Sequence, residues 1–415
     1  MSTKVFAFAV LLSICVLSVP AFATNGDNII GVGAISRSMG GVGAAAPQDA
    51  ITAVFGNPAA MCYIPCETSE VDFAATVFDP SVRANVSLFG QTHSATSQGA
   101  PYAFPAIGIY TPISENLRFG LAAYGVSGLG VDYKDTALKD FIGPPPGSLG
   151  IKTDLQIMKF APNLAYRILP NLSVGVALQL NWAALDLGDG SGHNFGVGTQ
   201  VGVSYKPVDR LSLGVTYQSP QQHTFKRIAD LNGDGQRDRL ALEQPQQVVV
   251  AAAYDIIPNL LLMEVDGKWL NWASAVGYKE FDWKDQYVVA VGLQAKPVSW
   301  AAIRVGYNYG NNPVKEHNGW DPGFISGNSI DVQGSQVNRF QYEYLRTVGF
   351  PAIVENHITA GVGINISKKV CLNLGYTHAF ENTMTETTSA GGTGPITLKS
   401  SLSEDSYEFG LNIMF

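Results

Sequence analysis

Apolar and polar residues alternate with a period of two along much of the chain, which is the pattern of half-buried β-strands. In residues 171–182 every even-numbered position is apolar and every odd-numbered position is small or polar. The same division recurs in 211–218, 358–366 and 370–376. The pattern predicts an all-β protein. Beyond residue 23 no apolar stretch reaches the ~18 residues that indicate a spanning helix.

The expected strands are long, and their connections fall into two classes. Fourteen candidate strands are expected near 69–87, 101–112, 116–127, 152–168, 171–187, 196–207, 210–227, 243–256, 259–274, 281–296, 300–313, 351–367, 369–384 and 402–415. Turns of two or three residues alternate with long loops such as 128–151 and 314–350. This is the plan of a transmembrane antiparallel β-barrel of the bacterial outer membrane. A water-soluble sandwich or barrel, the alternative, has no reason to sort its loops in this way.

Aromatic residues support the same fold. The chain ends on an apolar stripe that resembles the terminal strand by which outer-membrane proteins are recognised for insertion: Tyr407, Phe409, Leu411, Ile413 and Phe415. Other aromatic residues fall near strand ends, where the girdles of a membrane barrel are expected: Trp182, Trp269, Trp272, Trp283 and Trp300.

The first 23 residues have the three-part layout of a secretory signal peptide. Lys4 precedes an apolar run over 5–19, and residues 20–23 supply a small-x-small cleavage pattern. We predict cleavage after Ala23. The apolar run is shorter than the ~20 residues of a spanning helix, which argues against the alternative of a membrane anchor.

The composition agrees with a barrel whose two faces differ. The 415 residues are 46% apolar and only 14% charged, and the mean hydropathy is +0.10. Alternating lipid-facing and lumen-facing residues average to such an intermediate value. The formal charge of −8 argues against a nucleic-acid partner, whose phosphates require a basic surface.

Residues 24–68 are rich in Gly and Ala, too irregular for a strand and too apolar to extend into water. We therefore expect a hatch that plugs the lumen, followed by the barrel over 69–415. Parts of this segment resemble the N-terminal hatch of the FadL family of outer-membrane transporters of hydrophobic compounds: 33–44, 47–50 and 57–61. The similarity continues in order through four later stretches: 214–220, 269–272, 283–286 and 304–307.

The resemblance implies a monomeric barrel of fourteen strands that takes up hydrophobic compounds. Long-chain fatty acids are the expected substrates, and monoaromatic hydrocarbons are the alternative. Each CH₂ withdrawn from water contributes about 0.8 kcal/mol, so capture needs no energy source. We expect passive uptake, in which external capture and a hatch rearrangement precede lateral release through the barrel wall into the membrane. Lipopolysaccharide, a further expected partner, blocks direct partition into the outer leaflet.

Two sets of site residues follow from the resemblance. The hatch motif is placed at Asn57, Pro58 and Ala59. A side passage is expected beside the third strand, where Gly125 and Gly128 weaken the ladder and permit a bulge. The alternative is that these two glycines mark the end of a strand.

Two cations fall on the lumen side of the alternating pattern, Arg304 and Lys268. Each is a candidate for pairing with a fatty-acid carboxylate. The alternative for Lys268 is a salt-bridge network with Glu264 and Asp266, which share its face of the strand.

A loop in the second half of the chain matches the first half of a calcium-binding loop. Its oxygen ligands are Asp230, Asn232, Asp234 and Asp238, but Ala241 stands where the closing Glu is expected. Calcium is the one candidate cofactor, and a solvated turn is the alternative.

The cysteines lie in an oxidising compartment once the signal peptide is removed. Cys62 and Cys66 are candidates for a local disulfide bridge, which leaves Cys371 unpaired.

Two other functions are the alternatives to hydrophobic uptake. An outer-membrane lipid hydrolase or protease needs a nucleophile near a histidine, and the six histidines show no such motif. We therefore expect no enzymatic activity. A general porin needs an open lumen, and the N-terminal segment argues against one.

Overall fold

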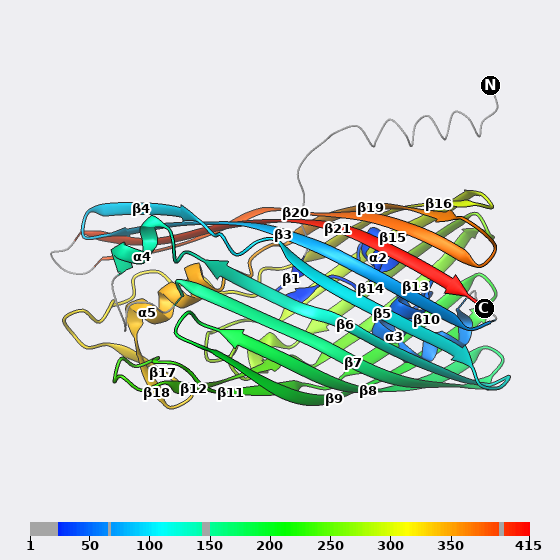
Figure 1. Ribbon diagram of the computed structural model, residues 1–415, viewed down its shortest axis with the longest axis horizontal. Coiled ribbons are helices and arrows are strands. Elements are labelled where there is room, and N and C mark those ends of the chain that lie inside the picture. Colours follow the sequence, from blue (N-terminus) through cyan, green and yellow to red (C-terminus); the bar gives the residue numbers. More distant parts are fainter. Residues whose placement is uncertain (1–23, 65–67, 143–149, 390–393) are drawn as a thin grey trace, which may run out of the picture.

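The long strands wrap around a common axis and form a cylinder (Figure 1). The computed structural model describes residues 24–64, 68–142, 150–389 and 394–415. The predicted signal peptide over 1–23 lies outside these residues, and so does Cys66. Within the described ranges, every helix is too short or too polar to cross a membrane.

The cylinder is a closed barrel. The main sheet of the described residues has seventeen strands, of which three are not part of the cylinder wall: β1 Thr24–Asn25, β2 Asn28–Ile29 and β4 Gln91–Thr96. The other fourteen form the wall: β3 Glu70–Leu88, β5 Tyr102–Pro112, β6 Leu117–Asp132, β7 Lys152–Leu169, β8 Leu172–Asp186, β9 Ser191–Val208, β10 Leu211–Gln218, β13 Gln247–Ile257, β14 Leu261–Leu270, β15 Gln286–Val298, β16 Ala301–Gly310, β19 Asn356–Asn365, β20 Val370–Ser389 and β21 Pro395–Met414. Each pairs antiparallel with the next, and β21 pairs back with β3, so the predicted fold class is confirmed.

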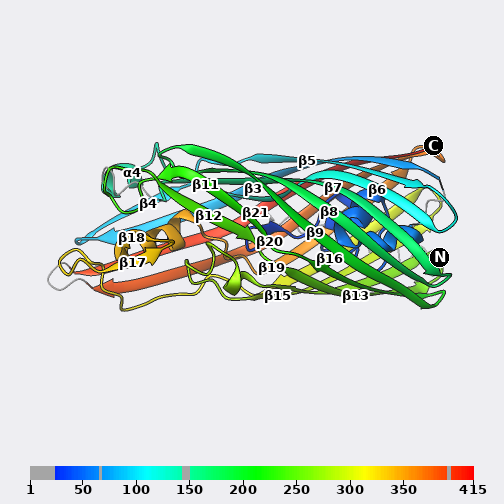
Figure 2. The same ribbon diagram turned by 90° about the horizontal axis from the view of Figure 1, so that it is seen from below.

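The connections are sorted as predicted, with short turns at one end and long loops at the other (Figures 1 and 2). We take the long-loop end as external. Its loops carry several elements: α4 Ala137–Ile142, the hairpin of β11 Gln221–Ala229 and β12 Asp238–Gln244, the hairpin of β17 Ser329–Val332 and β18 Ser335–Asn338, α5 Arg339–Tyr344 and the π-helical turn η3 Leu345–Gly349.

One predicted strand is wrong. The alternating pattern over 210–227 suggested a single strand, but β10 ends at Gln218 and β11 pairs with β12 in a separate sheet. Pro220 lies between them and has no backbone N–H to continue the ladder.

The two faces of the wall differ as the alternation predicted. On β8, Val176 is 47% exposed and Leu178 is 44% exposed, whereas Ser173 and Gln179 are buried. The apolar residues therefore face lipid and the polar residues face the interior, which identifies an inside-out barrel.

The tryptophans divide between two environments. Trp300 is 59% exposed beside a short turn, as expected of a girdle. The girdle prediction is wrong for Trp272 and Trp283, which are buried. The strand β14 ends at residue 270 and β15 begins at 286, so both tryptophans belong to an external loop that folds into the lumen.

Residues 24–64 lie inside the barrel. Besides β1 and β2 they form α2 Ala34–Ser38, α3 Ala50–Gly56 and the 3-10 helix η1 Pro58–Tyr63, and the two α-helices lie toward the short-turn end (Figure 1). The wall adapts to them at Gly292 and Gly306. A Cβ atom at Gly292 would lie 2.6 Å from the Met39 carbonyl oxygen, and one at Gly306 would clash with the backbone of Gly40.

Candidate functional site

A lumen-facing ladder on β14 holds the hatch. The Glu264 carboxylate accepts hydrogen bonds from the backbone N–H of Ala45 at 2.7 Å and of its neighbour at 3.2 Å. The Lys268 ammonium donates to the carbonyl oxygens of Ile30 at 3.0 Å and Gly41 at 2.9 Å. Lys268 thus binds the hatch backbone. This arrangement is closer to the polar lumen network, which was the predicted alternative for Lys268, than to a binding site for a carboxylate head group.

Other buried groups fix the hatch from neighbouring strands. The Arg37 side chain of α2 donates to Glu408 at 2.6 Å and to the Ser406 hydroxyl at 2.8 Å. At the start of α3, the Asp72 carboxylate of β3 accepts from the Ala50 backbone N–H at 2.7 Å. A buried charge without a partner is costly, so these contacts hold the hatch in one position.

The hatch motif caps η1 and attaches it to the wall. Asn57 Oδ1 accepts from the Ala59 N–H at 3.0 Å, and Pro58 occupies the first turn, where its missing N–H is harmless. Asn57 Nδ2 donates to the carbonyl oxygens of Ala44 at 2.8 Å and of Val203 in β9 at 3.2 Å. All three motif residues are buried.

Arg304 lies at the opposite end from the external loops. Its guanidinium donates to Gln294 at 2.7 Å and Asn373 at 2.8 Å. It lines a cavity of about 530 Å³ that also touches Lys296 and Cys371. Both the hatch and the length of the barrel separate this cavity from the external loops.

An apolar pocket lies under the external loops. It is lined by side chains from β8, β12 and two long loops: Leu185, Leu187, Leu240, Leu242, Tyr278, Phe281, Trp283, Leu345, Arg346 and Phe350. Its cavity is only about 20 Å³, whereas a cavity of about 150 Å³ accepts benzene. A ligand must therefore displace side chains to enter.

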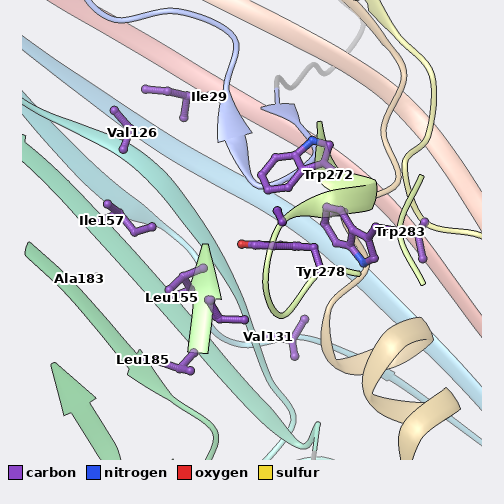
Figure 3. Packing of buried hydrophobic residues seen from close by; sticks show 14 of the residues in the cluster. Ile29, Val126, Val131, Leu155, Ile157, Ala183, Leu185, Trp272, Tyr278 and Trp283 are labelled. Carbon is purple, nitrogen blue, oxygen red and sulfur yellow. The ribbon is translucent and has the colours of Figure 1, made fainter. Parts of the chain in front are cut away.

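Aromatic rings connect this pocket to the hatch. Tyr278 packs between Trp272 and Trp283, with ring centroids 4.5 Å and 4.7 Å away. Figure 3 shows these rings opposite the apolar lumen face of β6, β7 and β8. The Tyr278 hydroxyl donates to Asp27 in the turn between β1 and β2. Burial raises the pKa of the Asp27 carboxyl to about 6.

The one cation of the apolar pocket is neutralised. Arg346 Nη1 contacts the carboxylates of Glu343 and of Glu386, the latter at 3.1 Å. Its Nε donates to the Phe281 carbonyl oxygen at 2.7 Å, and its Nη2 donates to the Lys315 carbonyl oxygen. Both carboxylates and the arginine are buried. Arg346 therefore has no donor nitrogen left without a protein partner.

Among the described residues, one group of side chains has metal-ligand geometry: His317, Glu343 and Glu386. The Arg346 guanidinium stands among all three, with Nη1 3.0 Å from His317 Nδ1. This positive charge serves as the counter-ion of the cluster, which is therefore an ion-pair network.

A second cation in the lumen is different. Lys159 is buried, and its ammonium has one long hydrogen bond, to Gln218 at 3.4 Å. It lines a small polar cavity beside the hatch together with Gln244, Lys268 and Val126.

The barrel wall has a gap between β5 and β6. Their ladder stops at the pair Ala106 and Tyr124, while β6 continues to Asp132 in register with β7. A bulge between Gly125 and Ser127 bends β6 at this point. Both predicted glycines of the side passage, Gly125 and Gly128, border the gap. On the lumen side, Asn28 of β2 pairs with Ser127.

The remaining predicted sites lie apart from this region. Asp230 accepts from the backbone N–H groups of Gly233 at 2.7 Å and Gly235 at 2.8 Å in an exposed external turn. The described carboxylates of this turn are not gathered as metal ligands, and calcium binding stays a prediction. Cys62 is buried and has no bridge to a described residue. Its predicted partner Cys66 lies outside the described residues, so that bridge also stays a prediction.

Sequence reasoning missed the groups that form the apolar pocket. Tyr278 and Arg346 lie in segments that carry no period-two pattern, and Phe281 stands at the start of the strand expected over 281–296. Their one signal is the density of aromatic and charged residues in loops 271–285 and 311–355, which is unusual for solvated connections.

A fourteen-stranded barrel with an apolar outer belt and a lumen closed by its own N-terminal segment belongs to the class of plugged outer-membrane β-barrels. Residues 17–193 match the family described as outer membrane protein transport proteins (OMPP1/FadL/TodX). Over this stretch, which is less than half of the chain, the protein is similar to that family.

Solved structures share the fold. The Pseudomonas putida toluene transporter TodX is 18% identical, with a TM-score of 0.67 over 93% of this chain and 99% of that chain. A Pseudomonas aeruginosa FadL homologue is 13% identical, with a TM-score of 0.68 over 96% and 100%. The Ralstonia pickettii toluene transporter TbuX is 15% identical, with a TM-score of 0.64 over 93% and 98%.

A curated relative matches a shorter stretch. An uncharacterised protein of Chlorobium limicola, encoded in the 5′ region of a phosphoenolpyruvate carboxykinase gene, is 39% identical over 82 residues. The match covers 20% of this chain and 40% of that relative.

Proposed function

We propose that this protein takes up small, neutral, hydrophobic molecules across the outer membrane, and that monoaromatic hydrocarbons fit best. The observation that carries the proposal is the apolar pocket, whose one cation, Arg346, is neutralised by Glu343 and Glu386. A carboxylate entering the pocket would compete with two protein carboxylates and lose its hydration. A neutral aromatic ring does not compete with these carboxylates and carries no charge whose hydration would be lost. That TodX and TbuX are named toluene transporters supports the choice.

The proposed route follows the apolar lining. A molecule is captured between the external loops, displaces the side chains that close the pocket, and moves along the lumen face of β6 to β8 (Figure 3). A rearrangement of the hatch then exposes the gap between β5 and β6, through which the molecule passes laterally into the membrane. The protein acts as a monomer surrounded by lipid and lipopolysaccharide, without a catalytic step.

Long-chain fatty acids are the second candidate, and one observation favours them. Lys159 is a buried ammonium with a single long hydrogen bond, to an amide, and it interacts with the Asp27 carboxylate by charge alone, without a direct hydrogen bond. A carboxylate head group would supply a direct partner. In this case the acyl chain would occupy the apolar lining above it.

Equilibrium binding of toluene and of palmitate to the purified protein separates the two candidates. The variant Leu185→Trp fills the apolar pocket, and Leu178→Trp, on the lipid face of the same strand, is its matched control. We expect toluene binding that Leu185→Trp abolishes and that Leu178→Trp and Lys159→Met leave unchanged. Tighter binding of palmitate than of toluene, lost in Lys159→Met, would overturn the proposal in favour of fatty acids.

A further inference from the structure

The gap between β5 and β6 is bounded by backbone hydrogen bonds on both sides. On the side of the short turns, the ladder ends at Ala106 and Tyr124. On the side of the external loops, the Gln98 N–H donates to the Asp132 carbonyl oxygen at 2.8 Å. Between these limits, residues 102–105 of β5 pair with β3 on their other side but not with β6. The wall therefore contains a window.

The side chain of Phe104 fills this window. A Cβ atom at Gly125 would lie 2.8 Å from Phe104 Cδ1, and one at Gly128 would clash with the far end of the same ring. The Tyr102 hydroxyl lies in the same way against Gly130. Glycine is needed at these positions of β6 because a side chain there would occupy the space of the rings.

The Phe104 ring spans the thickness of the wall. Its backbone pairs with Thr76, whose buried side chain faces the lumen, and its ring lies 6.0 Å from that of buried Phe78. The glycines that it covers belong to the opposite, lipid-facing side, because Gly125 pairs with Met158, the neighbour of lumen-facing Lys159. One apolar side chain thus separates the lumen from lipid.

We propose that Phe104 is the gate of the lateral exit. Opening the wall where neighbouring strands are paired would break backbone hydrogen bonds in lipid, at several kcal/mol each. At the window no ladder exists between β5 and β6, so a rotation of the Phe104 side chain away from Gly125 and Gly128 opens a path. Behind the ring, β2 contacts the same bend of β6 through Asn28 and Ser127. A shift of the hatch therefore clears the lumen side of the gate. This inference rests on the proposed lateral release.

The test combines removal of the gate with its locking. Phe104→Ala leaves the window open, and Phe160→Ala, a lipid-facing phenylalanine on β7, is the matched control. The pair Phe104→Cys and Gly125→Cys ties the strands across the window by a disulfide, because a Cβ atom at Gly125 would lie 3.4 Å from the Phe104 Cβ atom. The pair Thr111→Cys and Phe119→Cys, where the β5–β6 ladder is intact, is the control for crosslinking. Uptake of labelled toluene by intact cells is measured before and after reduction, together with toluene binding to each purified variant.

We expect faster uptake in Phe104→Ala, and in the window pair a loss of uptake that reductant restores, with toluene binding unchanged in both. An unchanged rate in Phe104→Ala with a blocked window pair would overturn the gate but leave lateral release standing. Full uptake in the oxidised window pair would overturn lateral release itself, and the gate with it. If the purified wild-type protein does not bind toluene, the proposed substrate class would be overturned.

Discussion

At the scale of single residues, the lumen is organised by polar groups whose partners are backbone atoms of the hatch. Glu264 and Lys268 lie on one strand and bind opposite kinds of group, N–H and C=O, in the same segment. The alternation of β14 places both in the lumen, and that much follows from sequence. Their partners do not, because Ile30 and Gly41 lie more than 200 residues away along the chain and carry no pattern that points to β14.

Replacing Lys268 by Met should destabilise the protein by about 2 kcal/mol, because two buried hatch carbonyl groups lose their donor. Equilibrium unfolding in guanidinium measures the change, and proteolysis of the hatch provides a second readout. Lys369→Met, an exposed lysine in a short turn, serves as the control. Equal stability of the two variants would mean that Lys268 does not hold the hatch.

The external loops should loosen as the pH rises. The hydrogen bond to Glu343 is the main cause that raises the pKa of His317. A histidine whose pKa is raised on folding stabilises the folded loops fully at pH values below its unfolded pKa of about 6.5. This stabilisation is lost as the pH rises through the pKa of the histidine in the folded protein. The charged groups that face His317 are Asp282, Arg339, Glu343, Arg346 and Glu386.

Protease cleavage within 311–328, compared at pH 5.5 and pH 8.5, checks this dependence. We expect faster cleavage at the higher pH in the wild-type protein and no pH difference in His317→Gln beyond that of the protease itself. Identical pH profiles for both proteins would rule out the histidine as the cause.

At the scale of elements, the wall was predictable and the external end was not. Each of the fourteen expected segments overlaps one wall strand, because one face of each strand must be apolar for lipid. The region 210–227 failed because its alternation continues through Pro220 into a hairpin that leaves the barrel. The sequences of the external loops show no hydrophobic periodicity, since α5 and η3 are shaped by contacts with other loops. The apolar pocket, built from those loops, was therefore missed.

The hatch is the element whose removal should change the molecule most. Deleting residues 24–64 removes α2, α3 and η1 from the lumen and leaves the polar inner wall in contact with water. We expect a steady ion conductance in planar bilayers for the deletion variant and none for the complete protein. A large steady conductance of the complete protein would identify a general porin, and a closed deletion variant would show that other segments plug the lumen.

At the scale of the whole molecule, the barrel joins two apolar surfaces through an interior that is mostly polar. The outer belt faces lipid, the apolar pocket lies under the external loops, and between them the lumen face of β6 to β8 forms an apolar strip (Figure 3). The low charge and near-neutral hydropathy of the chain follow from this division. Since transfer from water into the pocket and then into lipid is favourable throughout for an apolar solute, such a molecule needs no coupled energy source.

The rate at which labelled toluene and glycerol enter cells with and without the protein tests this account most directly. The account predicts that the protein accelerates the entry of toluene and leaves the entry of glycerol unchanged, because the hatch excludes polar solutes while the pocket and window accept apolar ones. Equal acceleration of both solutes, or of glycerol alone, would contradict it.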